Sequence, residues 1–190
     1  MALYDQRPLV VFEWMSLDGV FDADNMDQWF NPYHSDARAA AIKESICNSD
    51  AFLFGRTTYD MLAPYWSTLR HNEMGVADRL NRAPKHVVTS TPLEKPWSNS
   101  TVLEGDIVER VTALKHQFGR GILIQGSGTL VQSLLHTGLV DEYRFLVHPV
   151  LMGKGRRLFP EGMGQTKLKL HRVKELSLGV VQLSYVPYPL

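Results

Sequence analysis

The sequence predicts an α/β protein whose central sheet is mostly parallel and has antiparallel strands at its C-terminal edge. Three observations lead to this prediction. Short apolar runs alternate with segments of helical spacing along most of the 190 residues, and several of these runs end in glycine, hydroxyl or other turn residues. The last two segments, residues 168–173 and 180–186, alternate apolar and polar residues as the strands of a hairpin do. Length alone favours one domain, residues 1–190.

The first strand is expected at residues 8–15, PLVVFEWM, which are followed by the turn Ser16-Leu17-Asp18-Gly19. Residues 20–32 then mix aspartates with Trp29 and Phe30. This mixture is consistent with a loop over a pocket. It is equally consistent with an acidic surface loop that its aromatic residues hold in place.

A helix is expected from a Ser35 cap to Asn48, with Asp36 supplying negative charge in its first turn. The second strand, residues 51–54, leads into Gly55-Arg56-Thr57-Thr58. We expect Thr57 or Thr58 to cap the next helix, while Arg56 places a positive charge at the same edge of the sheet.

The middle of the chain is expected to contain a connection, two strands and two helices. Their ranges are a connection over residues 64–84 with a short helix near 76–80, a strand at 85–88, a strand at 101–103, and a helix from an Asp106 cap to about residue 118. The strand at 85–88 runs into Thr89-Ser90-Thr91, so hydroxyl groups stand just past its end.

Residues 119–149 contain a complete βαβ unit. It consists of a strand at 122–124, the turn Gly126-Ser127-Gly128-Thr129, a helix with Leu130, Leu134 and Leu135 on one face and Gly138 at its C-cap, and a strand at 143–147. Glycines let the backbone approach a ligand closely, and free N–H groups at a helix start attract anions.

The natural ligand of the Gly126–Thr129 turn is the phosphate of a nucleotide cofactor. Gly126 and Gly128 fit the start of the dinucleotide fingerprint, but Val131 occupies the third glycine position and no acidic residue follows about 20 residues on. The alternative is that both glycines only shape the turn between strand and helix.

Ligands bind open parallel sheets outside the carboxyl ends of the strands. Four strand ends carry the turns that begin at Ser16, Gly55, Thr89 and Gly126. Each is explicable as turn chemistry alone. Together they predict a polar edge suited to a phosphorylated dinucleotide, with Arg56 and Ser90 or Thr91 able to hold an additional phosphate.

Composition excludes several classes. Lys plus Arg and Asp plus Glu are 20 each, which argues against a nucleic-acid binder. The single cysteine, Cys47, fits a reducing cytoplasm, and no signal peptide or membrane span is expected. The seven histidines include no pair at close ligand spacing, so we expect no metal.

In series, these motifs resemble the dihydrofolate reductase superfamily, and more closely the reductase domain of the bacterial bifunctional riboflavin-biosynthesis deaminase-reductase and its stand-alone relatives. The motifs are SLDG, FGRTTYD, VVTST, IQGSGTLVQSLL and LVDEYRFLVHPVLMGKG, in the family's order and over nearly the whole chain. The resemblance implies a dihydrofolate-reductase-like three-layer α/β/α fold, NADPH as hydride donor and a homodimer.

By position, the resemblance implies cofactor contacts from three sets of residues. Gly55, Arg56, Thr57 and Thr58 would meet the adenosine side and its phosphates; Ser90 and Thr91 would take the 2'-phosphate with Arg56; Gly126, Ser127, Gly128 and Thr129 would hold the pyrophosphate. Asp36 lies nearest to the pterin-binding carboxylate of dihydrofolate reductases, but it does not match that position clearly, so folate is in doubt as the substrate.

Asp18 is the candidate to orient the substrate or relay a proton, with a turn residue as the alternative. Trp14, Trp29 and Trp66 could stack on a flat heterocycle or belong to the core. Lys154, Arg156 and Arg157 could bind a ribose phosphate or form an exposed basic loop. We therefore expect an NADPH-dependent reductase of a pyrimidine- or pteridine-like heterocycle, the riboflavin-pathway aminopyrimidine being the family's leading substrate. The alternatives are a reductase of other small carbonyl or imine compounds and a non-catalytic nucleotide-binding sensor.

Overall fold

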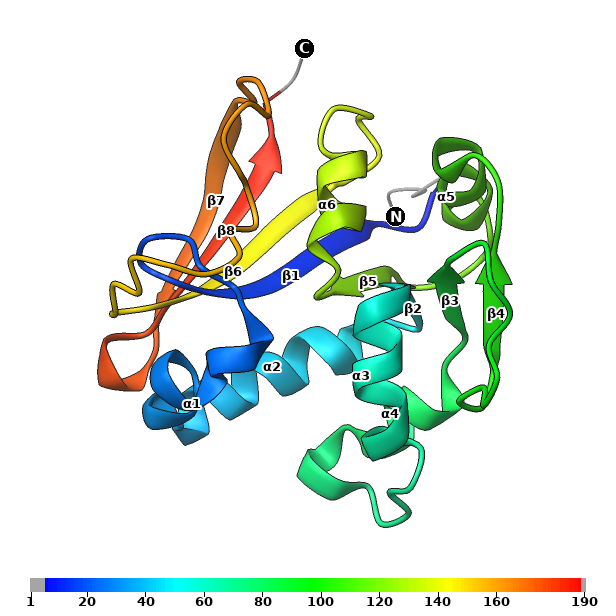
Figure 1. The fold of residues 1–190 in the computed structure, drawn as a ribbon, viewed down its shortest axis with the longest axis horizontal. Coiled ribbons are helices and arrows are strands. Elements are labelled where there is room, and N and C mark those ends of the chain that lie inside the picture. Colours follow the sequence, from blue (N-terminus) through cyan, green and yellow to red (C-terminus); the bar gives the residue numbers. More distant parts are fainter. Residues whose placement is uncertain (1–5, 189–190) are drawn as a thin grey trace, which may run out of the picture.

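The computed structural model describes residues 6–188 and contains an eight-stranded sheet (Figure 1). Across the sheet the strands are β4 (Ser100–Leu103), β3 (Lys85–Val88), β2 (Ala51–Gly55), β5 (Ile122–Gln125), β1 (Leu9–Ser16), β6 (Glu142–His148), β8 (Val181–Pro187) and β7 (Leu168–Glu175). Every pair from β4 to β6 is parallel, whereas β6–β8 and β8–β7 are antiparallel. The predicted parallel sheet with an antiparallel C-terminal edge is confirmed.

Helices cover both faces of this sheet, as the three-layer prediction requires (Figure 1). They are α1 (Met26–Trp29), α2 (Asp36–Asn48), α3 (Arg56–Trp66), α4 (Ala77–Arg82), α5 (Ile107–Lys115) and α6 (Gly128–Leu134). One core joins strand residues such as Phe12 and Phe54 to α2, α3 and α4. The other joins residues such as Val11 and Leu53 to α5 and α6. Alternate strand residues thus serve opposite layers.

The connections change direction between β1 and β5, which lie side by side in parallel. The chain leaves β1 through α2 and enters β2 on one side, whereas it leaves β5 through α6 and enters β6 on the other side. Such a switch point leaves a crevice at the carboxyl ends of the two strands, where ligands of open α/β sheets bind.

Local signals located most helix starts correctly. The Ser35 hydroxyl accepts from the Arg38 N–H at 3.2 Å, and the Asp106 carboxylate accepts from the Glu109 N–H at 2.9 Å. The expected threonine cap of α3 is wrong, because α3 begins at Arg56 behind Gly55 and has no side-chain cap. Gly138 is not the C-cap of α6, which ends at Leu134.

Candidate cofactor and substrate site

The turns after β2 and β5 touch each other at the carboxyl edge of the sheet. The Gly55 N–H donates to the Ser127 hydroxyl at 2.7 Å. Gly126 and Ser127 both have positive φ, at 68° and 71°. A Cβ on Gly126 would lie 2.8 Å from Thr58 Cγ2. The backbone of this turn therefore approaches α3 so closely that only glycine fits at Gly126.

Glu13, a buried residue of β1, forms a hydrogen bond with the same turn. It accepts from the Gly126 N–H at 2.9 Å, and it is 3% exposed. Burial raises the pKa of Glu13 well above its ordinary value, although the Gly126 bond lowers it. Burial thus favours the neutral carboxyl, so that a phosphate at this turn would not face a second negative charge.

Arg56 joins the start of α3 to the end of β3. Its Nη1 donates to the Thr91 hydroxyl at 2.6 Å, and its Nε donates to Asp60 at 2.7 Å. Thr91 and its neighbour in the chain, Ser90, are both exposed. The structure thus brings the guanidinium to Thr91, one of the two hydroxyl residues expected to hold the 2'-phosphate with it.

The other expected cofactor residues differ in how far a ligand can reach them. Thr57 and Thr129 are exposed, and Gly55 and Ser127 are half-buried. Thr58 is buried against Gly126, and Gly128 is buried against the ring of Phe21. Thr58 and Gly128 therefore shape the turn by packing and offer a ligand little side-chain surface.

Asp18 connects the loop after β1 to the loop after β6. Its carboxylate accepts from the Ser16 hydroxyl at 2.6 Å, the Met152 N–H at 3.1 Å and the Gly153 N–H at 2.8 Å. These bonds, the Ser16 bond first, lower the pKa of Asp18 to about 2. A group with this pKa holds no proton near neutral pH, and its three hydrogen bonds support the alternative interpretation of Asp18 as a turn residue. The role of Asp18 in orienting a substrate or relaying a proton stays a prediction.

Asp18 is expected to stabilise the fold only while it is ionised. Its pKa of about 2 lies below the ordinary 3.8, so its stabilising effect is present above pH 3.8 and is lost as the pH falls toward 2. Asp18→Asn should therefore lower the urea midpoint at about pH 6, and the difference from wild type should shrink at about pH 2.5. An equal difference at both pH values would contradict this assignment.

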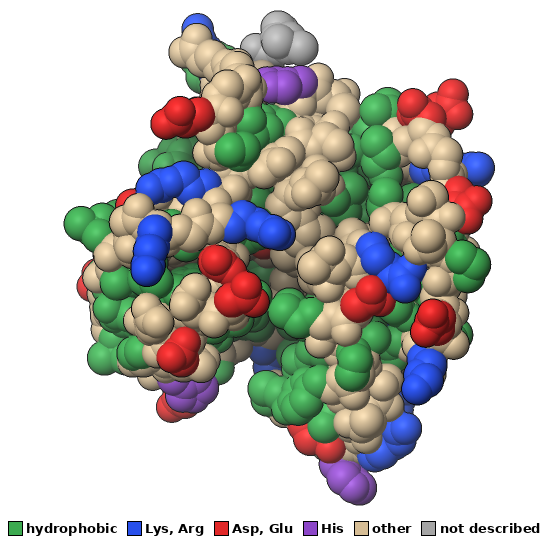
Figure 2. All heavy atoms as spheres, in the orientation of Figure 1, with side chains coloured by type: hydrophobic (Ala, Val, Ile, Leu, Met, Phe, Trp, Pro, Cys, Tyr) green, Lys and Arg blue, Asp and Glu red, His purple; other side chains and the backbone are tan. Residues whose placement is uncertain are grey.

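A cavity of about 250 Å³ lies between the loop after β1 and the loop after β6. It is lined by Asn25, Gln28, Met152, Lys154 and Gly155. Figure 2 shows that this face of the molecule is hollowed between the α1 side and the α3 side. Lys154 faces the cavity, whereas Arg157 is paired with Asp18, so only part of the expected basic loop is free for a substrate phosphate.

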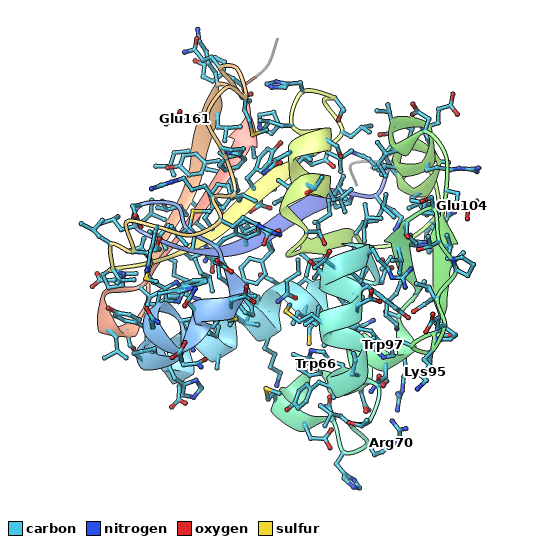
Figure 3. The ribbon with its side chains drawn as sticks, in the orientation of Figure 1. Trp66, Arg70, Lys95, Trp97, Glu104 and Glu161 are labelled. Atoms are coloured by element: carbon cyan, nitrogen blue, oxygen red, sulfur yellow. The ribbon has the colours of Figure 1, made fainter. Side chains whose placement is uncertain are left out.

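Trp29, Asp36 and Trp66, which were expected near a substrate, lie in different environments. Trp29 is 2% exposed and packs edge-on against His148, with its Nε1 donating to the Asp22 carbonyl at 3.0 Å. Asp36 is exposed in the first turn of α2. Trp66, labelled in Figure 3, lies near the end of α3 and packs against the core. Trp29 is a core residue, which was the alternative interpretation, and Trp66 is half-buried against the core.

A cluster surrounds Phe30, in which sequence reasoning named Trp14 as a possible stacking residue but missed Arg38 and His148. The Trp14 ring stacks on the Phe30 ring at 4.4 Å with a 15° tilt, and the Arg38 guanidinium lies 3.9 Å from the centre of the same ring. Arg38 is 3% exposed and donates to the Phe30 carbonyl. The available signal was weak: an arginine stands among alanines in α2, next to a helix start.

His148 closes this cluster at the end of β6. Its Nδ1 lies 3.1 Å from the Met15 carbonyl and its Nε2 lies 3.4 Å from Arg38 Nη1. Because a carbonyl only accepts, Nδ1 carries the proton and Nε2 accepts from Arg38. Burial, together with the Arg38 charge, lowers the pKa of His148 to about 4 despite the Met15 bond, so this side chain is neutral at physiological pH.

The described residues contain neither a metal cluster nor a membrane helix. Between residues 6 and 188, no three or more side chains of His, Cys, Asp or Glu gather as a metal site would require. No helix in the same range has the length and apolar character needed to cross a membrane.

Comparisons with known proteins identify relatives along almost the whole chain. The family model for the RibD C-terminal domain matches residues 7–182. The protein YyaP of Bacillus subtilis is 27% identical over 184 residues, which are 95% of either chain.

Solved structures confirm the fold expected from the resemblance. A Shewanella sp. PV-4 protein provisionally assigned to riboflavin biosynthesis superimposes with a TM-score of 0.71 at 23% identity, over 96% of this chain and 99% of that one. The Thermotoga maritima diaminohydroxyphosphoribosylaminopyrimidine deaminase/5-amino-6-(5-phosphoribosylamino)uracil reductase superimposes with a TM-score of 0.68 at 15% identity. In that case the match covers 96% of this chain and 57% of the bifunctional protein.

Proposed function

The chain belongs to the RibD C-terminal domain family, and we propose on this basis that it is an NADPH-dependent reductase of a pyrimidine- or pteridine-like heterocycle. The Thermotoga maritima protein of the same fold is named as a 5-amino-6-(5-phosphoribosylamino)uracil reductase. A substrate of this chemical class is the leading candidate for this chain. A homodimer and a cytoplasmic location, both implied by the family resemblance, belong to the same proposal.

The observation that carries the proposal is the arrangement of three strand ends along one edge. The close-packed turn at Gly126 meets the start of α3, and Arg56 links that start to Thr91. A glycine turn without side-chain bulk suits a pyrophosphate, and a guanidinium beside hydroxyl groups suits the extra phosphate that distinguishes NADPH from NADH. These residues fit the cofactor.

Bound NADPH would supply a hydride to the carbon of a substrate C=N or C=O bond, leaving NADP⁺, while the substrate nitrogen or oxygen would take up one proton. The residues of this chain would hold the two partners in line and exclude water. Asp18 is ionised near neutral pH and so holds no proton to donate, and we propose water as the proton source.

Arg56→Ala is expected to weaken NADPH binding about 30-fold, the loss of one charge-assisted contact to a phosphate. NADH binding should change much less, since NADH lacks the 2'-phosphate. Fluorescence titration of both nucleotides measures the two effects. Arg82→Ala is the matched control, because Arg82 forms an exposed ion pair with Asp78 at the same helical spacing as Arg56 with Asp60.

The outcomes separate the alternatives. Equal weakening of both nucleotides would remove the 2'-phosphate role from Arg56, and no binding of either would remove the reductase proposal. If NADPH binds, its oxidation by an aminopyrimidine or by simple carbonyl compounds distinguishes the two enzymatic functions. Tight binding without turnover of any substrate would favour the nucleotide sensor.

A further inference from the structure

We propose that the Phe30 side chain occupies a slot for the substrate ring between Trp14 and Arg38, and that a flat heterocycle with carbonyl oxygens displaces it. The inference rests on the proposed function, because it names the subsite and the substrate class of that reductase.

The slot has two flat walls. The Trp14 ring and the Arg38 guanidinium lie 4.4 Å and 3.9 Å from the centre of the Phe30 ring. Two groups this close to one ring centre cannot share a face, so they lie on opposite faces of Phe30. The phenyl ring thus takes the place that any flat aromatic ligand would take between an indole and a guanidinium.

The chemistry of the walls favours a more polar ring than phenyl. Arg38 is almost fully buried, yet its hydrogen-bond partners are the neutral Phe30 carbonyl and His148. No carboxylate of residues 6–188 forms an ion pair with it. A buried cation without a counter-charge attracts carbonyl oxygens, which carry partial negative charge.

Two unpartnered donors border Phe30. Trp14 Nε1 and Arg38 Nε are buried and have no hydrogen-bond partner. Leaving a buried donor unpaired costs free energy, so the arrangement with Phe30 in the slot carries a penalty on both sides. Both N–H bonds lie in the plane of the wall that carries them, so only water or ligand groups that reach past the edge of the stacked ring relieve this penalty.

The position of the slot suits a substrate. Trp14 lies two residues before the end of β1, at the switch point where the cofactor is proposed to bind. Phe30 lies between α1 and the 3-10 turn Asn31–Tyr33 and is half-buried, so its side chain borders solvent. In Figure 1, α1 lies against the start of α2, which carries Arg38.

Calorimetric titration with lumazine, a pteridine with two carbonyl groups, tests the proposal without NADPH. Phe30→Ala should bind lumazine about tenfold more tightly than wild type, since the competing ring is gone. The affinity for quinoxaline, a fused bicyclic ring without carbonyls, should rise less in Phe30→Ala than the affinity for lumazine. Adding Trp14→Leu to Phe30→Ala should abolish the increase in lumazine affinity.

Two further variants serve as controls. Phe159→Ala removes an aromatic ring that contacts Phe145 in the other core and should leave lumazine binding unchanged. Phe30→Leu provides a milder change should Phe30→Ala unfold. The proposal is overturned if folded Phe30 variants bind lumazine no more tightly than wild type, or if Trp14→Leu does not reduce the gain. NADPH titration of the same proteins reports on the proposed function separately.

Discussion

Gly126→Ala is expected to weaken NADPH binding about 100-fold while lowering the free energy of unfolding by about 2 kcal/mol. The new methyl group would lie 2.8 Å from Thr58 Cγ2 and 3.0 Å from its hydroxyl. It would also stand at a φ of 68°, where a side chain is strained. The turn must shift, and the backbone N–H groups proposed to meet the pyrophosphate would shift with it.

Gly138→Ala separates strain from crowding in this experiment. Gly138 has a φ of 72°, close to that of Gly126, but a Cβ there would meet nothing within 4 Å. We expect Gly138→Ala to cost about 1 kcal/mol of stability and to leave NADPH binding unchanged. Nucleotide titration and urea unfolding measure the two effects. If Gly126→Ala bound NADPH as tightly as Gly138→Ala, the turn would not be a cofactor contact.

The elements of the fold were predictable because their signals are local. Apolar runs such as residues 51–54 became buried strands, and the caps Ser35 and Asp106 bond to N–H groups three residues away. The N-terminus of α3 was mispredicted for a tertiary reason. Thr58 turns inward against Gly126, a contact with a residue far along the chain that no local rule contains.

The candidate cofactor side of the site was predictable from the turns at the strand ends. Turn sequences mark the carboxyl edge of the sheet, and the structure brings Arg56 and Thr91 together there. The slot around Phe30 was not predictable, because its walls come from β1 and α2 and depend on how the loop between them folds. The low pKa of Asp18 depends first on the nearby Ser16 hydroxyl, and in addition on two N–H groups of a loop more than a hundred residues away, which local reasoning cannot foresee.

The opposite edge of the sheet depends on a second long-range contact, between Arg7 and Asp50. Asp50 is paired with Arg7, and it also accepts from the Arg120 N–H at 2.7 Å and the Gly121 N–H at 3.2 Å. One carboxylate thus joins the segments that lead into β1, β2 and β5. Burial raises its pKa, but these donors outweigh burial, so the pKa of Asp50 is lowered.

Asp50→Ala is expected to lower the free energy of unfolding by about 3–5 kcal/mol, the usual cost of leaving one partner of a buried ion pair. The Arg7 side chain is 6% exposed, and its Nε already has no partner, so the variant would leave a buried cation with few acceptors. Asp78→Ala is the matched control. It removes an exposed ion pair with Arg82 and should cost about 0.5 kcal/mol.

Urea unfolding of both variants distinguishes two hypotheses for what aligns strands β1, β2 and β5 with one another. If apolar packing alone sets the alignment of β1, β2 and β5, the two variants should lose similar, small amounts of stability. If Asp50 fixes it, only Asp50→Ala should lose several kcal/mol. In Asp50→Ala the turns at the carboxyl ends of β1, β2 and β5 would then be held less firmly, because each strand runs from the edge that carries Asp50 to the edge that carries these turns. NADPH binding by Asp50→Ala should consequently weaken, although Asp50 lies at the edge away from the proposed cofactor.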